Sequence, residues 1–189
     1  MNATLSKKIR FSDAVYAIGT TPKSLRLWLQ RGVVDLHSEA PEGGWHEFSF
    51  VDIGILAITR KLSDFGVPVA EAGKIANMIM GDDFYPQMHY VQNPGNIPAG
   101  VLASVWSNQR LYVYRNGDGW TLEHVALYET HLSRLHDEGF DPELPSGVAE
   151  LRKEFEPDAV FISIDVEAVL RTAFTRAEES ISEGMDEEE

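Results

Sequence analysis

Two basic side chains near the N-terminus, Lys23 and Arg26, are spaced as neighbours on one face of a helix. They follow Thr21 and Pro22, a pair typical of a helix start, because Thr caps free backbone N–H groups and Pro has no N–H to leave unpaired. Basic residues at a helix start oppose the helix dipole, and an anion facing that end offsets the cost. Two interpretations follow: contact with phosphate or with the O6 and N7 acceptors of guanine, or plain solvation of an exposed helix.

Charge is distributed unevenly along the chain. The 189 residues carry a formal net charge of -14, yet residues 1–31 hold six Lys or Arg and one acidic residue, Asp13. Residues 81–189 hold seven basic and 22 acidic residues. Because the Debye length is about 8 Å at physiological salt, distant carboxylates still leave a local basic patch able to meet an anion. The pattern predicts one part that faces an anion, with surface solubility as the plain alternative.

Several classes of function are excluded or disfavoured by composition. The chain has no Cys, which excludes disulfides, thiolate metal sites and Cys nucleophiles. No apolar run approaches the roughly 20 residues that span a bilayer, and the N-terminus lacks the apolar stretch of a signal peptide, so we expect a cytoplasmic protein without a membrane partner. The sequence contains no glycine-rich phosphate loop, nucleophile elbow or HExxH motif, so we expect no enzyme, cofactor or metal.

Caps and turns predict the elements that position Lys23 and Arg26. A short helix begins near residues 11–13 with Ser12 as N-cap and ends at Gly19. A second helix begins at Pro22 and ends at Gly32. The apolar stripe that docks it on the first helix is Leu25, Trp28 and Leu29.

A turn and two further helices follow. Residues 36–49 contain a Pro-Glu-Gly-Gly turn between flanks able to pair as strands, which predicts a β-hairpin. Ser49 and Asp52 have the spacing of a capping box and open a helix that ends at Gly66. One more amphipathic helix occupies residues 68–80.

Four short segments in this region match the pattern of a known family in order and spacing. They are GTTPKSLR (19–26), RGVV (31–34), GWHEFS (44–49) with Asp52, and RKLSDFGV (60–67). The run resembles the N-terminal DNA-binding domain of the MerR family of transcription regulators, over about residues 9–80. The resemblance implies that residues 1–80 are a winged helix-turn-helix domain and that the partner is double-stranded DNA.

The resemblance also implies which residues contact DNA. The helix from Pro22 would enter the major groove, and the hairpin 36–49 would be a wing on the flanking backbone. Trp45 takes the place of a wing aromatic. The candidate DNA-binding residues are Arg10, Thr21, Lys23, Ser24, Arg26, Trp45 and His46.

A second interpretation belongs to another class: a winged-helix protein-interaction module that has lost DNA binding. The family often has two basic residues after the wing aromatic, whereas this chain has His46 and Glu47. A carboxylate facing a phosphate is repulsive, and each lost phosphate contact lowers the salt slope of binding by about one. The two interpretations differ in whether the protein binds DNA at low salt.

The rest of the chain predicts a second domain. Residues 81–100 hold three Pro and three Gly, which forbid an uninterrupted helix and indicate a linker, with a short strand at 88–92. Residues 101–177 are predicted to form a small α+β domain that dimerises or senses a small-molecule or protein effector, and residues 178–189 a disordered acidic tail. The fold class is therefore a mostly α N-terminal winged helix-turn-helix plus a small α+β C-terminal domain. The expected elements are a hairpin of 101–106 and 110–115, helices at 121–139 and 148–155, a strand at 159–164, and a helix from Asp165 to about residue 176.

Two groups of side chains in the second half raise chemical alternatives. His124 and His131 lie seven apart on the predicted helix 121–139, but neither Glu129 nor His136 shares their face, so structural histidines are favoured over a metal site. Four aromatic residues cluster around the predicted hairpin, where they either line a ligand pocket or pack between strands. They are Trp106, Tyr112, Tyr114 and Trp120.

Overall fold

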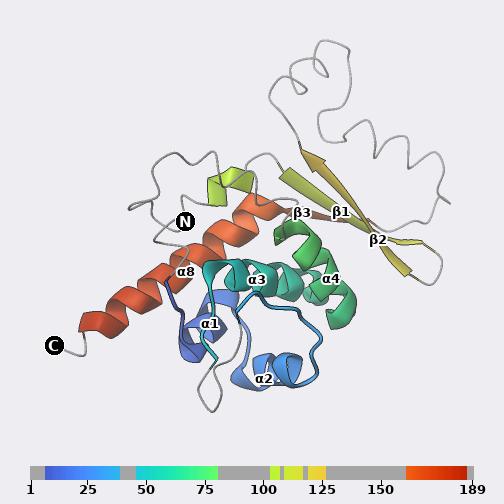
Figure 1. Ribbon diagram of the computed structural model, residues 1–189. Helices are drawn as coiled ribbons and strands as arrows, with labels where there is room; N and C mark the ends of the chain where they lie inside the picture. Colours follow the sequence, from blue (N-terminus) through green and yellow to red (C-terminus); the bar gives the residue numbers. More distant parts are fainter. Residues whose placement is uncertain are drawn as a thin grey trace, which may run out of the picture. The chain divides into compact units, whose positions relative to one another are not determined.

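The computed structural model describes residues 7–38, 46–80, 103–106, 109–116, 119–126 and 161–186. The chain divides into two compact units, each described by itself below. Unit 1 is Met1–Val105 with Ala168–Glu189, and unit 2 is Trp106–Glu167. The chain therefore leaves unit 1, forms unit 2 and returns to unit 1 through its last helix (Figure 1).

The first helix, α1, spans Phe11–Ile18 and ends at Gly19, as predicted. Gly19 has a φ of 63°, the left-handed conformation that glycine adopts without steric cost. The predicted N-cap at Ser12 is wrong: Arg10 holds that position and makes no side-chain cap, so Ser12 lies within the first turn. The helix begins earlier because its first residue places an aromatic ring against Phe48, with ring centroids 6.4 Å apart.

The second helix, α2, spans Pro22–Gln30, and its predicted start is confirmed. The Thr21 hydroxyl accepts the backbone N–H of Ser24 at 3.1 Å, which satisfies one of the free donors at the helix start. Leu25 and Trp28 are buried, as the apolar stripe predicts. Burial of this stripe turns the opposite side of α2 outward.

The core of unit 1 is built around α3 (Phe50–Asp64), which α4 (Val69–Met80) covers on one side. The predicted capping box is present, with Ser49 and Asp52 each bonding the other's backbone N–H. Every residue from 50 to 59 is buried. Burial around the whole circumference identifies α3 as the central helix of the unit.

The last helix, α8 (Val166–Asp186), belongs to unit 1 from Ala168 onward. The Phe174 ring meets the Phe50 ring edge to face, with centroids 5.5 Å apart and an interplanar angle of 90°. In Figure 1 the helix runs alongside α1 and α3. Its buried residues recur at helical spacing, and they are Val166, Leu170, Ala173, Phe174 and Ala177.

The far end of α8 differs from the prediction of a disordered tail at residues 178–189. The helix does not end near residue 176 but continues through Asp186, and residues 187–189 lie outside the described residues. The Ser180 hydroxyl donates to a carboxylate oxygen of Asp13 at 2.7 Å. This contact with α1 comes from tertiary structure, which acidic composition alone does not reveal.

Unit 2 contains an antiparallel sheet in the order β2-β1-β3. Its strands are β1 (Gln109–Asn116), β2 (Gly119–Ala126) and β3 (Phe161–Asp165), the last as predicted. Val113 on the central strand is fully buried and lies opposite Leu122 of β2 and Ile162 of β3 in the register.

Two predictions in this region are wrong. Residues 101–106 were expected to be the first strand of a hairpin, but Ala103–Trp106 form a 3₁₀ helix, η2. The strand β1 pairs with β2 instead, and β2 occupies the start of the predicted helix 121–139. Trp120 and Leu122 alternate with Thr121 and Glu123, the two-residue period of a strand. The predicted linker 81–100 with its strand, and the predicted helix 148–155, lie outside the described residues.

Candidate nucleic-acid interface

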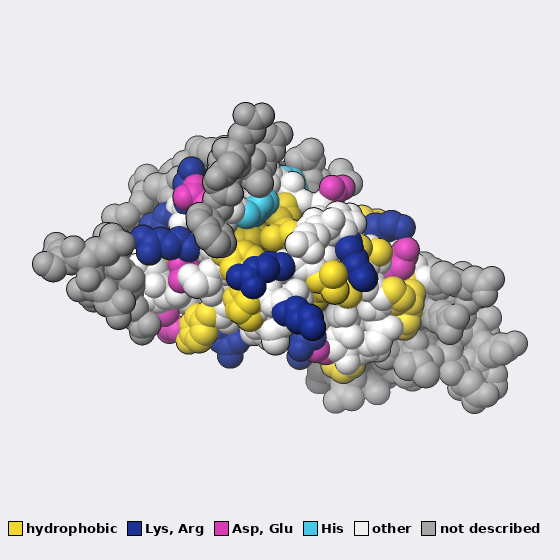
Figure 2. Space-filling model, turned by 90° about the horizontal axis from the view of Figure 1, so that it is seen from below, with side chains coloured by type: hydrophobic (Ala, Val, Ile, Leu, Met, Phe, Trp, Pro, Cys, Tyr) yellow, Lys and Arg dark blue, Asp and Glu magenta, His cyan; other side chains and the backbone are white. Residues whose placement is uncertain are grey.

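The outward side of α2 carries the basic residues singled out in the sequence. Lys23 and Arg26 are both exposed, whereas Leu25 between them is fully buried. Figure 2 shows the side of the molecule on which α2 lies, and Lys and Arg side chains are spread over it with apolar side chains between them. The basic residues therefore project from α2 and are available to an anion.

Arg26 is also fixed in direction by the neighbouring helix. Its guanidinium carbon lies 5.2 Å from the centroid of the Phe11 ring on α1. A guanidinium carries five N–H donors, so a cation–π contact leaves donors for an external group. The stacking joins α1 to α2 and orders a donor that can bond phosphate or guanine in a bidentate way.

The hydroxyls of Thr21 and Ser24 are engaged in the start of α2. Besides the cap on the Ser24 N–H, the two side-chain oxygens lie 2.8 Å apart and share a hydrogen bond. Each hydroxyl oxygen has a second lone pair, so the pair keeps some capacity to bond an external group. Their established role is to position the first turn, which carries Lys23.

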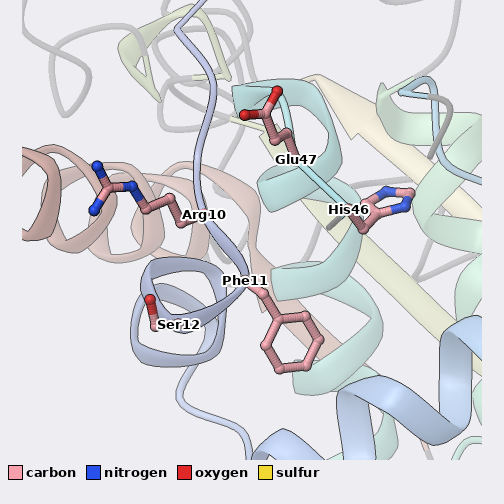
Figure 3. A pocket seen from close by; sticks show the side chains of 5 residues that line it. All are labelled: Arg10, Phe11, Ser12, His46 and Glu47. Atoms are coloured by element: carbon pink, nitrogen blue, oxygen red, sulfur yellow. The ribbon is translucent and has the colours of Figure 1, made fainter. Parts of the chain in front are cut away.

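A pocket of about 440 Å³ adjoins the start of α1. Figure 3 shows Arg10 extending toward α8 and His46 on the opposite side, with the Phe11 ring between them. Two of the predicted DNA-binding residues, Arg10 and His46, thus line one pocket, and Phe11 connects this pocket to Arg26. Nothing in the sequence pattern singled out Phe11, because its role depends on a contact between two helices. The lining residues are Arg10, Phe11, Ser12, His46 and Glu47.

Comparison with known protein families finds a match to the N-terminal part of the chain. Residues 9–79 match the family described as MerR HTH family regulatory protein. These residues form a MerR-family helix-turn-helix domain. The match covers α1 to α4 and ends before unit 2 and α8. No curated protein matches the chain.

In the MerR-type domain, the departure at Glu47 is balanced by a nearby cation. Lys8 forms an ion pair with Glu47, in which the Lys8 side chain is largely exposed and the Glu47 side chain partly so. An exposed pair of this kind contributes only about 0–1 kcal/mol to stability, so its main effect is on local charge. Glu47 therefore does not present an unmatched carboxylate beside the pocket.

His46 is held between two legs of the predicted hairpin. Its ring lies 4.5 Å from the Phe48 ring centroid, and its Nε2 shares a hydrogen bond of 3.3 Å with the Ser38 hydroxyl. Backbone bonds of 2.8 Å in both directions pair Ile9 with Phe48. The base of the segment is thus fixed against the chain that leads into α1. Trp45 lies outside the described residues.

A buried carboxylate fastens both ends of this segment to α3. One oxygen of Asp52 accepts the backbone N–H of His37 at 2.7 Å and that of Ser38 at 3.4 Å. The other accepts the Ser49 backbone N–H at 2.8 Å and its hydroxyl at 2.7 Å. The sequence predicted Asp52 only as half of a capping box, because its second set of partners lies 14 and 15 residues away.

The described residues contain neither a metal-binding cluster nor a membrane-spanning helix. In the ranges that the structure describes, no group of three or more His, Asp or Glu side chains is arranged to hold a metal. His124 lies in β2 rather than on a helix, and His131 lies outside the described residues. Within the same ranges, no helix has the length and apolar character needed to cross a bilayer.

Proposed function

We propose that the MerR-type domain binds double-stranded DNA sequence-specifically and that the protein regulates transcription. In this proposal α2 enters the major groove, and the segment 36–49 is a wing that lies on the flanking backbone. The observation that carries it is the exposed pair Lys23 and Arg26 on a capped helix whose opposite side is buried. The family match of residues 9–79 supports the same assignment.

The proposed contacts divide into two kinds. Lys23 and Arg26 contact phosphates or purine edges in the major groove, and Arg26 is pre-ordered by its stacking on Phe11. The remaining contacts are to the backbone and the groove wall. They come from Thr21 and Ser24 at the start of α2, Arg10 and His46 at the pocket, and Trp45 on the wing.

We further propose that separate segments of the chain have separate functions. Residues 1–80 bind DNA, residues 81–100 link, and residues 101–177 dimerise or sense a small-molecule or protein effector. We favour a dimer because a protein with two-fold symmetry matches the two half-sites of a palindromic DNA site. Helix α8 begins inside this region of the sequence, but its residues from Ala168 onward pack in unit 1, so the compact part of the proposed effector region is unit 2, Trp106–Glu167. The protein would act in the cytoplasm without a membrane partner.

The test begins with selection of a target from a random duplex pool and measures binding by fluorescence anisotropy. A Lys23→Ala/Arg26→Ala variant is expected to lose about 10-fold to 100-fold or more in affinity for the selected site, since each good base contact is worth about 1–3 kcal/mol. The matched control is Lys61→Ala/Lys74→Ala, which removes the same charge from α3 and α4.

The salt dependence adds a second readout. If both residues contact phosphate, the slope of log affinity against log salt falls by about two in the Lys23/Arg26 variant. Equal affinity of this variant and the control would show that α2 is wrongly assigned. No binding of the wild-type protein to any duplex at low salt would favour a protein-interaction module instead.

A further inference from the structure

The end of α8 is strongly acidic. Residues 178–186, named here the acidic end of α8, carry four carboxylates and no Lys or Arg. Glu178 is half-buried and Glu179 is exposed. The four acidic residues are Glu178, Glu179, Glu183 and Asp186.

The acidic end lies against the first turn of α1. The hydrogen bond of 2.7 Å between Ser180 and Asp13 joins the two helices at this point. Asp13 is three residues after Arg10, so one helical turn separates this contact from a proposed DNA contact. In Figure 3 the Arg10 side chain extends from the start of α1 toward α8.

The position of the acidic end is set by the rest of α8. Phe174 packs on Phe50 in the core of unit 1, and Ala177 is fully buried one turn before the Ser180 contact. Glu178 follows Phe174 by four residues and therefore lies on the flank of the buried stripe. Glu178 and Glu179 are thus held at a defined place on the DNA-binding unit.

We propose that the acidic end of α8 is an autoinhibitory element that competes with DNA phosphate at the start of α1. The inference rests on the proposed DNA-binding function. The Ser180–Asp13 contact lies about one helical turn, roughly 5 Å, from Arg10, which is within one Debye length of about 8 Å at physiological salt. Carboxylates beside Ser180 therefore oppose the charge of Arg10 and repel an approaching phosphate. DNA binding at this position requires the acidic end to move away or its charge to be matched by a cation.

The acidic end of α8 is connected through the backbone to the sheet of unit 2. α8 begins at Val166, directly after β3 ends at Asp165, with no intervening residue. The two elements are thus continuous in the backbone, and in this proposal a change in β3 is transmitted to α8.

The test neutralises the acidic end without shortening the helix. Glu178→Gln/Glu179→Gln keeps side-chain size and helix propensity while removing two charges. The control, Asp64→Asn/Glu71→Gln, removes the same charge from ion pairs on α3 and α4. Both variants and the wild-type chain are titrated with a mixed-sequence duplex of about three helical turns, at salt between about 50 and 200 mM.

The expected result is that the α8 variant binds about threefold to tenfold tighter than the wild type at low salt, and that the control variant changes less. The advantage should shrink as salt rises, because the repulsion is screened. Equal tightening of both variants, or none in either, would overturn the autoinhibitory contact while leaving DNA binding intact. If none of the three proteins binds DNA, both the contact and the proposed function are wrong.

Discussion

Gly73 approaches Val33 so closely that a Cβ at this position would stand 2.8 Å from the Val33 carbonyl oxygen. The neighbouring turn of α4 adds a hydrogen bond, in which the Asn77 amide donates to the Asp35 carbonyl oxygen at 3.0 Å. Helix α4 thereby holds the backbone that leads out of α2. The orientation of α2 is thus set from both ends, by the Thr21 cap at its start and by α4 beyond its end.

Replacing Gly73 with alanine tests this close approach. In an open helix interior the change would stabilise by about 1 kcal/mol, because alanine has the higher helix propensity. Here the obstructing atom belongs to the backbone, so α4 or the Val33 segment must shift. We expect Gly73→Ala to lower the free energy of unfolding by about 1–3 kcal/mol, measured by urea denaturation.

Gly54→Ala is the matched control on α3. A Cβ there would lie 2.5 Å from the terminal methyl of Met80, the far end of a flexible side chain, and 3.1 Å from a Leu170 methyl. Met80 can rotate away, so the loss should be smaller than for Gly73→Ala. If the two variants unfold at the same urea concentration, backbone contact at Gly73 does not limit the packing of α4.

Asp52 provides a second prediction, because its carboxylate serves two segments. Asp52→Ala leaves the backbone N–H groups of His37 and Ser49, whose bonds to it are partly buried, without their acceptor. We expect the free energy of unfolding to fall by about 3 kcal/mol, because hydrogen bonds to a charged group are lost and the N–H donors left without an acceptor remain partly desolvated. Ser49→Ala removes only the cap and should cost about 1 kcal/mol. Similar losses in the two variants would mean that the bonds to His37 and Ser38 contribute nothing.

The sequence predicted two helix caps correctly, because these depend on residues close together along the chain. The Thr21 cap and the Ser49–Asp52 box each join residues three apart, so their geometry follows from residue type and spacing. The second role of Asp52 was not predictable, because His37 lies 15 residues before it in the chain and no local spacing brings the two together. The stacking of Arg26 on Phe11 was missed for the same reason.

Secondary structure in the C-terminal half was harder to predict, because short segments there fit both a helical and a strand pattern. Leu122 and Val125 suit a helix by spacing, yet pairing with β1 places both in a strand. The acidic composition of residues 178–189 favoured disorder, but a stripe that includes Ala173 and Ala177 docks α8 and carries the helix onward. Tertiary contact decided both outcomes, and no local signal encodes it.

The contact between Arg26 and the Phe11 ring predicts that the two side chains stabilise the fold cooperatively. Phe11→Leu keeps an apolar side chain at the start of α1 but removes the ring face over which the guanidinium lies. A double-mutant cycle with Arg26→Ala should give an interaction energy of about 0.5–1 kcal/mol in urea denaturation, typical of an exposed cation–π contact. Phe11→Leu alone should also weaken DNA binding by about threefold, through lost pre-ordering of Arg26. Strict additivity in the cycle would show that the ring does not hold Arg26.

Phe174 predicts that the functional DNA-binding unit extends beyond the family match. This residue lies far outside residues 9–79, yet its ring is 1% exposed and packs on Phe50 at the start of the central helix. Phe174→Ala should therefore lower the stability of α3 itself by about 3–5 kcal/mol, seen as faster amide hydrogen exchange along residues 53–59. The control is Phe65→Ala, since Phe65 is 55% exposed and its loss should cost well under about 1 kcal/mol. Unchanged exchange in α3 of the Phe174 variant would mean that α8 is an accessory helix and that residues 9–79 are stable without it.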